Sequence, residues 1–146
     1  MPHLTLPTSG DGLFLNVMVG LNGKDTADLQ AAGQVIPRPL LLRGQLDNGS
    51  NITCVAARVL HHFGLLPRYY TTTTTTVGGA QVGVYEVSFS IPQQGTLTGP
   101  LLVLDYLQVM EWVDPPEGVE VLVGLDVLER LLMIHDGPRK EFTLGD

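Results

Sequence analysis

The chain has 146 residues, of which 44% are hydrophobic, and this length and apolar content are typical of one domain with a single buried core. Its formal charge of −7 at pH 7 repels phosphate backbones, so nucleic acid is not expected as a partner. A single cysteine, Cys54, excludes an internal disulfide framework and a multi-cysteine metal site.

No apolar run approaches the ~18 residues of a membrane span. The first residues also lack a basic segment followed by a hydrophobic one, which a secretory signal would have. We therefore expect a soluble, cytoplasmic protein without a membrane partner. Because His61 and His62 are neighbours and would point in different directions on a helix, while His3 and His135 are isolated, we expect no metal and no other cofactor.

The N-terminal third of the chain predicts one strand and little else. Residues 1–12 are expected to be disordered, and the apolar run 13–20 is a strand. Gly23–Asp25 is interpreted as a turn. Residues 26–34 contain alanine and are left open between a loop and a short helical turn.

The next segment predicts a strand, a tight break and a helix. Residues 40–46 follow two prolines, form the strand and lead directly into Asp47. In residues 52–63 apolar side chains recur at spacings of three and four, which indicates one face of a helix. Gly64 then supplies a C-terminal stop for this helix.

A long β-hairpin is predicted over residues 69–91. The six threonines of residues 71–76 are β-branched and favour a strand over disorder. Gly78 and Gly79 suit the tip, and residues 82–91 alternate between apolar and polar side chains.

The C-terminal part predicts two strands, a helix and a closing hairpin. The strands are residues 101–107 and 119–123, and the helix is residues 126–132. Asp126, with an acidic residue three positions later, has the form of an N-terminal capping box. Residues 133–144 are expected to be the hairpin.

Three features now stand in order along the chain, and together they resemble aspartic peptidases. Residues 46–54 look like the Asp-Thr/Ser-Gly-Ala/Ser active-site motif, residues 122–128 like the hydrophobic-hydrophobic-Gly motif, and residues 74–79 occupy the place of a flap tip. An Asp-x-Gly triplet alone is common, and Asn-Gly also marks plain hairpin turns. The helical spacing after Asn48-Gly49 and the order of all three features favour the retropepsin-like family, over about residues 38–144.

The resemblance implies a fold and a set of site residues. It implies an all-β fold in one domain of residues 1–146: a closed, barrel-like half of an acid protease with one or two short helices and a β-hairpin flap. The implied site consists of the catalytic Asp47; the active-site loop residues Asn48, Gly49 and Ser50; the flap and substrate-binding residues Thr76, Val77, Gly78, Gly79 and Ala80; and the structural motif Leu122, Val123 and Gly124.

Peptide hydrolysis without a metal needs a water made nucleophilic and a carbonyl made electrophilic, and two carboxylates close together do both. They share one proton because like charges that close cannot both ionise. Only Asp47 lies in an Asp-x-Gly triplet with the expected context. Asp126 follows the Gly124 motif and has a sufficient role as a helix cap, so we reject it as the second carboxylate. The resemblance therefore implies an aspartic endopeptidase that acts on peptides or proteins as a homodimer, with one Asp47 from each protomer.

Two residues depart from the family pattern. Asn48 replaces the usual Thr or Ser, whose hydroxyl would bond across the dimer, and this leaves open an alternative: a catalytically weak or inactive dimerisation or peptide-binding module. Leu125 replaces an arginine that braces the dimer in viral members. The strand of residues 142–144 is therefore expected to contribute to the interface, because family dimers interleave their chain ends.

Overall fold

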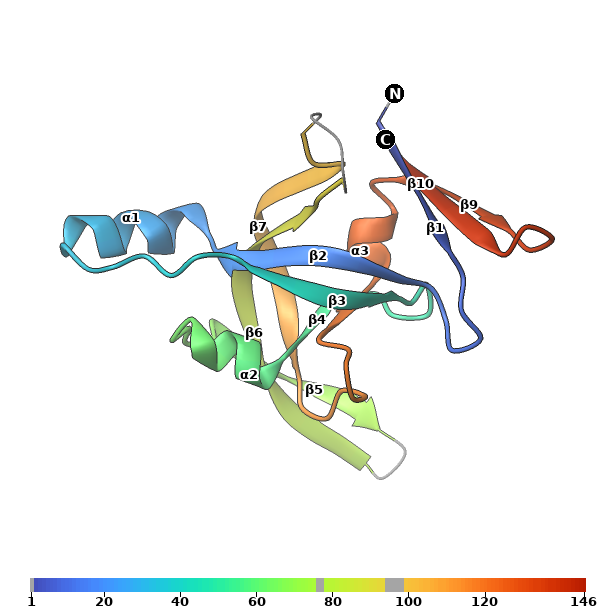
Figure 1. Ribbon diagram of the computed structural model, residues 1–146. Helices are drawn as coiled ribbons and strands as arrows, with labels where there is room; N and C mark the ends of the chain where they lie inside the picture. Colours follow the sequence, from blue (N-terminus) through green and yellow to red (C-terminus); the bar gives the residue numbers. More distant parts are fainter. Residues whose placement is uncertain (1, 76–77, 94–98) are drawn as a thin grey trace.

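The chain folds around a closed β-barrel (Figure 1), and the computed structural model describes residues 2–75, 78–93 and 99–146. Six strands form the ring in the order β2, β3, β8, β4, β7 and β6, and β2 pairs again with β6 to close it. Their bounds are β2 Phe14–Leu21, β3 Leu40–Leu46, β8 Val121–Val123, β4 Cys54–Ala56, β7 Leu102–Trp112 and β6 Gly78–Ile91. This arrangement confirms the predicted all-β class and the closed barrel.

Alternating side chains of the barrel strands fill its interior. Val17 and Val19 of β2 are fully buried, as are Val87 of β6 and Val121 and Val123 of β8. Successive side chains of a strand point to opposite faces, so these residues all face the barrel interior. Full burial of each such side chain contributes roughly 1.5–3 kcal/mol before entropy is counted, and this core holds the strand ends in fixed positions.

The predicted hairpin extends beyond the barrel. Strand β5, Tyr69–Thr75, pairs antiparallel with the first half of β6, from Tyr69 opposite Val84 to Thr75 opposite Gly78. The expected tip residues Thr76 and Val77 lie outside the described residues. Gly78, Gly79 and Ala80 are the first three residues of β6.

A second, three-stranded sheet contains both ends of the chain. Its order is β1 (His3–Pro7), β10 (Glu141–Gly145) and β9 (Leu132–Asp136). The expectation of disorder over residues 1–12 is therefore wrong for β1. Leu4 and Leu6 alternate toward the core, and β1 gains a full antiparallel register with β10. The predicted C-terminal hairpin is confirmed as β9 and β10.

The first helix corrects one prediction. Helix α1 is Gly23–Ala31, so Gly23–Asp25 begins a helix and is not a turn. The Asn22 side-chain oxygen accepts a hydrogen bond from the Asp25 backbone N–H at 2.8 Å, which caps the helix. No residue of α1 is buried, and the helix projects from the barrel at the end of β2 (Figure 1). A helix without a buried apolar face leaves little periodic signal in the sequence.

The second helix is shorter than predicted, because residues 54–56 are the strand β4 and α2 is only Ala57–His62. The buried residues of the strand run directly into those of the helix, and together they imitate one helical face. Gly64 ends this segment with a positive φ of 66°, as its predicted role as a stop requires.

Three elements of the C-terminal half differ in length from their predictions. β7 is longer than the predicted 101–107, and β8 is shorter than 119–123. Helix α3, Leu125–Leu128, begins earlier and ends earlier than 126–132. Gly124 is its N-cap residue, and Asp126 lies inside the first turn, so the predicted capping box is not formed.

Candidate active site around Asp47

Asp47 lies at the carboxyl end of β3, where the barrel fixes its backbone. β3 and β8 run parallel, with Leu46 opposite Val123. The Asp47 N–H donates to the Val123 carbonyl at 2.9 Å, and the Asp47 carbonyl accepts from the Ser50 N–H at 3.2 Å. These two bonds hold Asp47 at the start of a turn that leads away from the barrel.

The loop after Asp47 contacts the carboxylate itself. The Gly49 N–H donates to Asp47 Oδ1 at 2.8 Å. Asp47 is half-buried, whereas Asn48 and Gly49 are exposed. A carboxylate held by a backbone N–H at the mouth of a loop is oriented and also open to a substrate or a water molecule.

Gly124 lies directly against this loop. A Cβ atom added at Gly124 would meet the Ile52 carbonyl carbon at 2.7 Å and the Ser50 carbonyl oxygen at 2.9 Å. The next residue, Leu125, donates its N–H to that same Ser50 oxygen at 2.8 Å. The structure therefore brings together the two sequence motifs, which lie more than seventy residues apart, and only glycine fits at the contact.

A buried threonine joins the same two segments, and sequence reasoning missed it. Thr53 is 0% exposed. Its hydroxyl donates to Asp126 Oδ1 at 2.7 Å and its N–H donates to Asp126 Oδ2 at 3.0 Å. The Gly124 N–H donates to the Thr53 hydroxyl at 3.1 Å. The signal available in the sequence was a polar Thr53 inside the apolar run that follows Asn51.

Asp126 therefore clamps the loop and does not cap the helix from outside. Besides the two bonds from Thr53, its Oδ1 accepts from the Val127 N–H at 2.9 Å. Although Asp126 does not form the predicted capping box, it is still a poor candidate for the second catalytic carboxylate. Its two oxygens already accept three hydrogen bonds, from the Thr53 hydroxyl, the Thr53 N–H and the Val127 N–H.

Thr53→Val is expected to lower the free energy of unfolding by about 2–3 kcal/mol, because valine keeps the shape but leaves the Gly124 N–H and Asp126 Oδ1 without the hydroxyl. Urea unfolding monitored by circular dichroism measures the change. Thr53→Ser retains the hydroxyl and should lose less than half as much. A loss in Thr53→Ser as large as the loss in Thr53→Val would mean that the methyl group of Thr53 contributes as much to stability as the hydroxyl clamp.

Cys54 follows Thr53 in the chain, and its thiol is expected to react slowly. Burial, with smaller contributions from the charges of Asp126 and Asp47, raises the pKa of the Cys54 thiol to about 11. The thiolate is the reactive form, so the folded protein holds very little of it at neutral pH.

Alkylation of Cys54 by iodoacetamide at pH 8 should be about 100-fold slower in the folded protein than in urea, since the pKa lies about two units above the value of 9.0 for a free thiol. Mass spectrometry of timed samples gives both rates. Similar rates in the two states would show that Cys54 is more exposed and less influenced by its neighbours than the structure indicates.

The remaining predicted site residues do not all meet at Asp47. Asn48 makes no side-chain hydrogen bond to any residue that the structure describes. Gly79 lies against β5, where an added Cβ would meet Thr72 Cγ2 at 2.7 Å. Leu122 and Val123 are in β8, beneath the loop. In the described part of the chain, no three His, Cys, Asp or Glu residues form a group that could hold a metal ion. None of its helices is long and apolar enough to cross a bilayer.

Comparison with known proteins gives similarity in structure only. The sequence matches no protein-family model and no curated protein. A retropepsin-like aspartic protease from Rickettsia conorii has a similar structure, with a TM-score of 0.64 and 14% identity over 98% of this chain and 89% of that chain.

Two further solved structures match less closely in shape. Simian foamy virus (mac) protease has a TM-score of 0.45 and 19% identity over 80% of this chain and 92% of its own. The retroviral protease-like domain of Ddi1 from Leishmania major has a TM-score of 0.46 and 15% identity over 90% of this chain and 92% of its own. On the match to the rickettsial protease, the chain has a retropepsin-like fold, as the sequence motifs predicted.

Proposed function

We propose that this protein is an aspartic endopeptidase in which two protomers each contribute one Asp47. The observation that carries the proposal is the geometry of the Asp47 loop. Asp47 ends a barrel strand, its carboxylate accepts the Gly49 N–H, and Gly124 lies against the loop at a distance that only glycine allows. This arrangement presents one oriented carboxylate per chain at an open position.

Two such carboxylates would carry out hydrolysis by exchanging one shared proton. The unprotonated oxygen takes a proton from water as the water oxygen attacks the peptide carbonyl carbon, and the protonated carboxyl donates to the carbonyl oxygen. When the C–N bond breaks, the leaving nitrogen takes the proton that the first carboxylate had accepted from water. One hydroxyl of the tetrahedral intermediate returns its proton to the other carboxylate as the carbonyl re-forms, so the pair again holds one proton. The two groups titrate as a unit, so any apparent pKa belongs to the pair.

The three-stranded sheet supplies a surface for the second protomer, but not through the side chains that were expected. Phe142 and Leu144 of β10 are 0% exposed, because they pack into the core of their own chain. On the opposite face, Leu132 is 60% exposed and Ile134 is 53% exposed. Exposed apolar side chains on a sheet face favour contact with another protein surface, so we place the dimer contact on this face.

The β5–β6 hairpin, Tyr69–Ile91, is the proposed flap. It extends beyond the barrel (Figure 1), and the expected substrate contacts Gly78, Gly79 and Ala80 are the first residues of β6, while Thr76 and Val77 lie outside the described residues. In this proposal the hairpin closes over an extended peptide that lies between the two protomers, and closure excludes water from the reacting bond.

Asn48 favours a second candidate function, a peptide-binding module with weak catalysis or none. Its amide is exposed and makes no hydrogen bond to a described residue of its own chain. The amide is also larger than the hydroxyl of Thr or Ser and has a different shape, so it does not reproduce the bond that such a hydroxyl would make across a dimer. Cleavage of denatured casein and of a peptide library at acidic pH distinguishes the two functions. Cleavage that a statine inhibitor blocks supports the peptidase, whereas binding of peptides without cleavage supports the module.

A further inference from the structure

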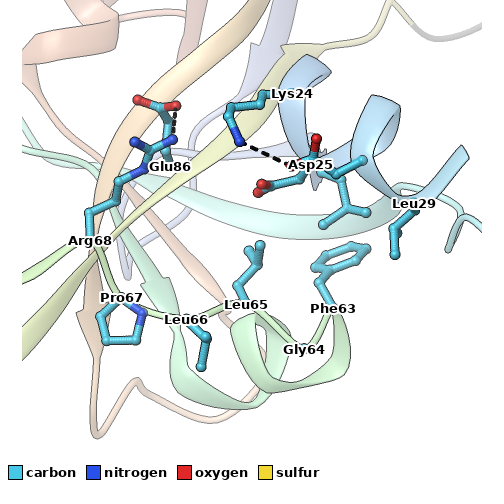
Figure 2. A pocket seen from close by; sticks show the side chains of 12 residues that line it. Lys24, Asp25, Leu29, Phe63, Gly64, Leu65, Leu66, Pro67, Arg68 and Glu86 are labelled. Atoms are coloured by element: carbon cyan, nitrogen blue, oxygen red, sulfur yellow. Dashed lines mark hydrogen bonds and ion pairs between the residues drawn. The ribbon is translucent and has the colours of Figure 1, made fainter. Parts of the chain in front are cut away.

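A groove runs alongside helix α1, at a place that the Asp47 chemistry does not use. One wall is α1, and the other is the segment of residues 63–68 that follows α2 (Figure 2). The groove has a volume of about 420 Å³, and Asp47 is not among the residues that line it. Leu29, Phe63 and Leu65 point into the space between the two walls and make an apolar floor.

An exposed leucine stands at the rim of the groove, with its side chain on the other side of the segment from Leu65 and Phe63 (Figure 2). Leu66 lines the groove and is 85% exposed, whereas its neighbour Phe63 is 8% exposed. A large apolar side chain that stands in water beside an open apolar floor is the pattern of a surface that another molecule covers.

The charged residues around the floor are mostly paired with one another. Lys24 Nζ lies 3.0 Å from Asp28 Oδ2 across one turn of α1, and Arg68 lies 2.8 Å from Glu86 on β6. The hydrogen bond from Lys24 to Asp28 is the main cause of a raised Lys24 pKa, so the lysine keeps its charge at neutral pH. Both cations of the groove are therefore committed to carboxylates.

Asp25 is the carboxylate of the groove that makes no ion pair, and the nearest cation that its charge acts on, Lys24, is bonded to Asp28. Asp25 Oδ2 accepts a hydrogen bond from the Asn22 amide at 3.0 Å, but no lysine or arginine in the described part of the chain lies within ion-pair distance of it. The groove holds three carboxylates and two cations. An occupant that brings a positive charge to Asp25 completes the charge pairing of the groove.

These charges decide between the possible occupants. A phosphate or an anionic lipid surface would meet an excess of carboxylates, and both cations are already engaged. A second copy of this chain carries fifteen acidic and only eight basic residues, so it is a poor source of positive charge. A peptide segment with a bulky apolar side chain and an adjacent Lys or Arg fits both the floor and Asp25.

We propose that this groove is a docking site for basic-apolar peptide segments of a partner protein, with the floor of Leu29, Phe63 and Leu65 holding the apolar side chain, Leu66 contacting the peptide at the rim, and Asp25 pairing with the cation. The site acts separately from Asp47, so the proposal stands whether or not the protein cleaves peptides.

The test is a methyl-detected NMR titration of the 146-residue chain with the peptide acetyl-Leu-Arg-Phe-Lys-amide, beside the matched acidic peptide acetyl-Leu-Glu-Phe-Glu-amide. The expected result is a saturable shift of the Leu29, Leu65 and Leu66 methyl signals with the basic peptide only. The same titration of the Asp47→Ala variant should give the same shifts, which separates this groove from the proposed catalytic cleft.

Two variants and two controls complete the test. Asp25→Asn should weaken binding of the basic peptide about three- to fivefold, and Leu66→Ser should weaken it about tenfold. Asp11→Asn and Val113→Ser change an exposed carboxylate and a 67% exposed valine elsewhere, and should have no effect. The proposal is overturned if the acidic peptide causes equal shifts, or if the shifts appear only near Asp47. It is also overturned if self-association of the chain covers the groove as concentration rises, or if Asp25→Asn and Leu66→Ser bind the basic peptide as well as the parent does.

Discussion

Replacing Asp47 with alanine is expected to abolish peptide hydrolysis, with a loss of at least about a thousandfold, because the carboxylate supplies both the acid and the base of the pair. The fold should survive. The bonds of the Asp47 N–H to Val123 and of the Asp47 carbonyl to Ser50 are made by backbone atoms and are kept, and only the bond from Gly49 to the carboxylate is lost.

Cleavage of a quenched fluorescent peptide library measures this effect, and circular dichroism and sedimentation check the fold and the association. Asp105→Ala, which removes an exposed carboxylate on β7, is the matched control and should keep full activity. An Asp47→Ala protein with activity within tenfold of the parent would mean that the catalytic group lies elsewhere.

Gly124→Ala is expected to destabilise the protein by about 3 kcal/mol or more, the upper part of the range for overpacked sites. The added methyl would approach three backbone atoms of the Asp47 loop, namely the Ile52 carbonyl carbon at 2.7 Å, the Ile52 oxygen at 2.8 Å and the Ser50 oxygen at 2.9 Å. Backbone atoms cannot turn away as a flexible side chain can, so the loop itself must shift.

Urea unfolding gives the change in stability, and Gly137→Ala is the control. Gly137 has no atom within 4 Å of an added Cβ, so its replacement should change the free energy of unfolding by less than about 0.5 kcal/mol. Activity should fall in Gly124→Ala even at temperatures where it is folded, since the displaced loop carries Asp47. An unfolding midpoint equal to that of the parent would contradict the close contact between the two motifs.

The barrel could be predicted from the sequence because its strands have local signals. The run of residues 40–46 ends at a clear break, and residues 82–91 alternate with a period of two, which is enough to identify β3 and β6. The order of the Asp47 loop, the hairpin and the Gly124 motif then indicated the fold. These features are all readable within a few residues.

The elements that were missed depend on contacts that no local pattern carries. β4 pairs with residues of β7 and β8 that lie more than fifty positions further along the chain, and no local pattern signals such pairing, so its residues were interpreted as helix. α1 has no buried residue, so it produced no periodic apolar face. The partner of Asp126 is Thr53, 73 positions away, and nothing near Asp126 points to it. The local pattern around Asp126 predicted a capping box, but in the folded chain its carboxylate accepts hydrogen bonds from the distant Thr53.

The paired-Asp47 mechanism is tested most directly by mixing subunits. Parent protein and Asp47→Ala protein are combined in equal amounts, exchange is verified with differently tagged chains, and activity is read beside sedimentation. With random exchange about half of the dimers are mixed and about a quarter are fully parental, so we expect about half of the activity that the same number of parent chains would give alone. Activity should also fall on dilution below the dimer dissociation constant. Activity proportional to the number of parent chains after proven exchange, or full activity from a strictly monomeric species, would contradict the mechanism.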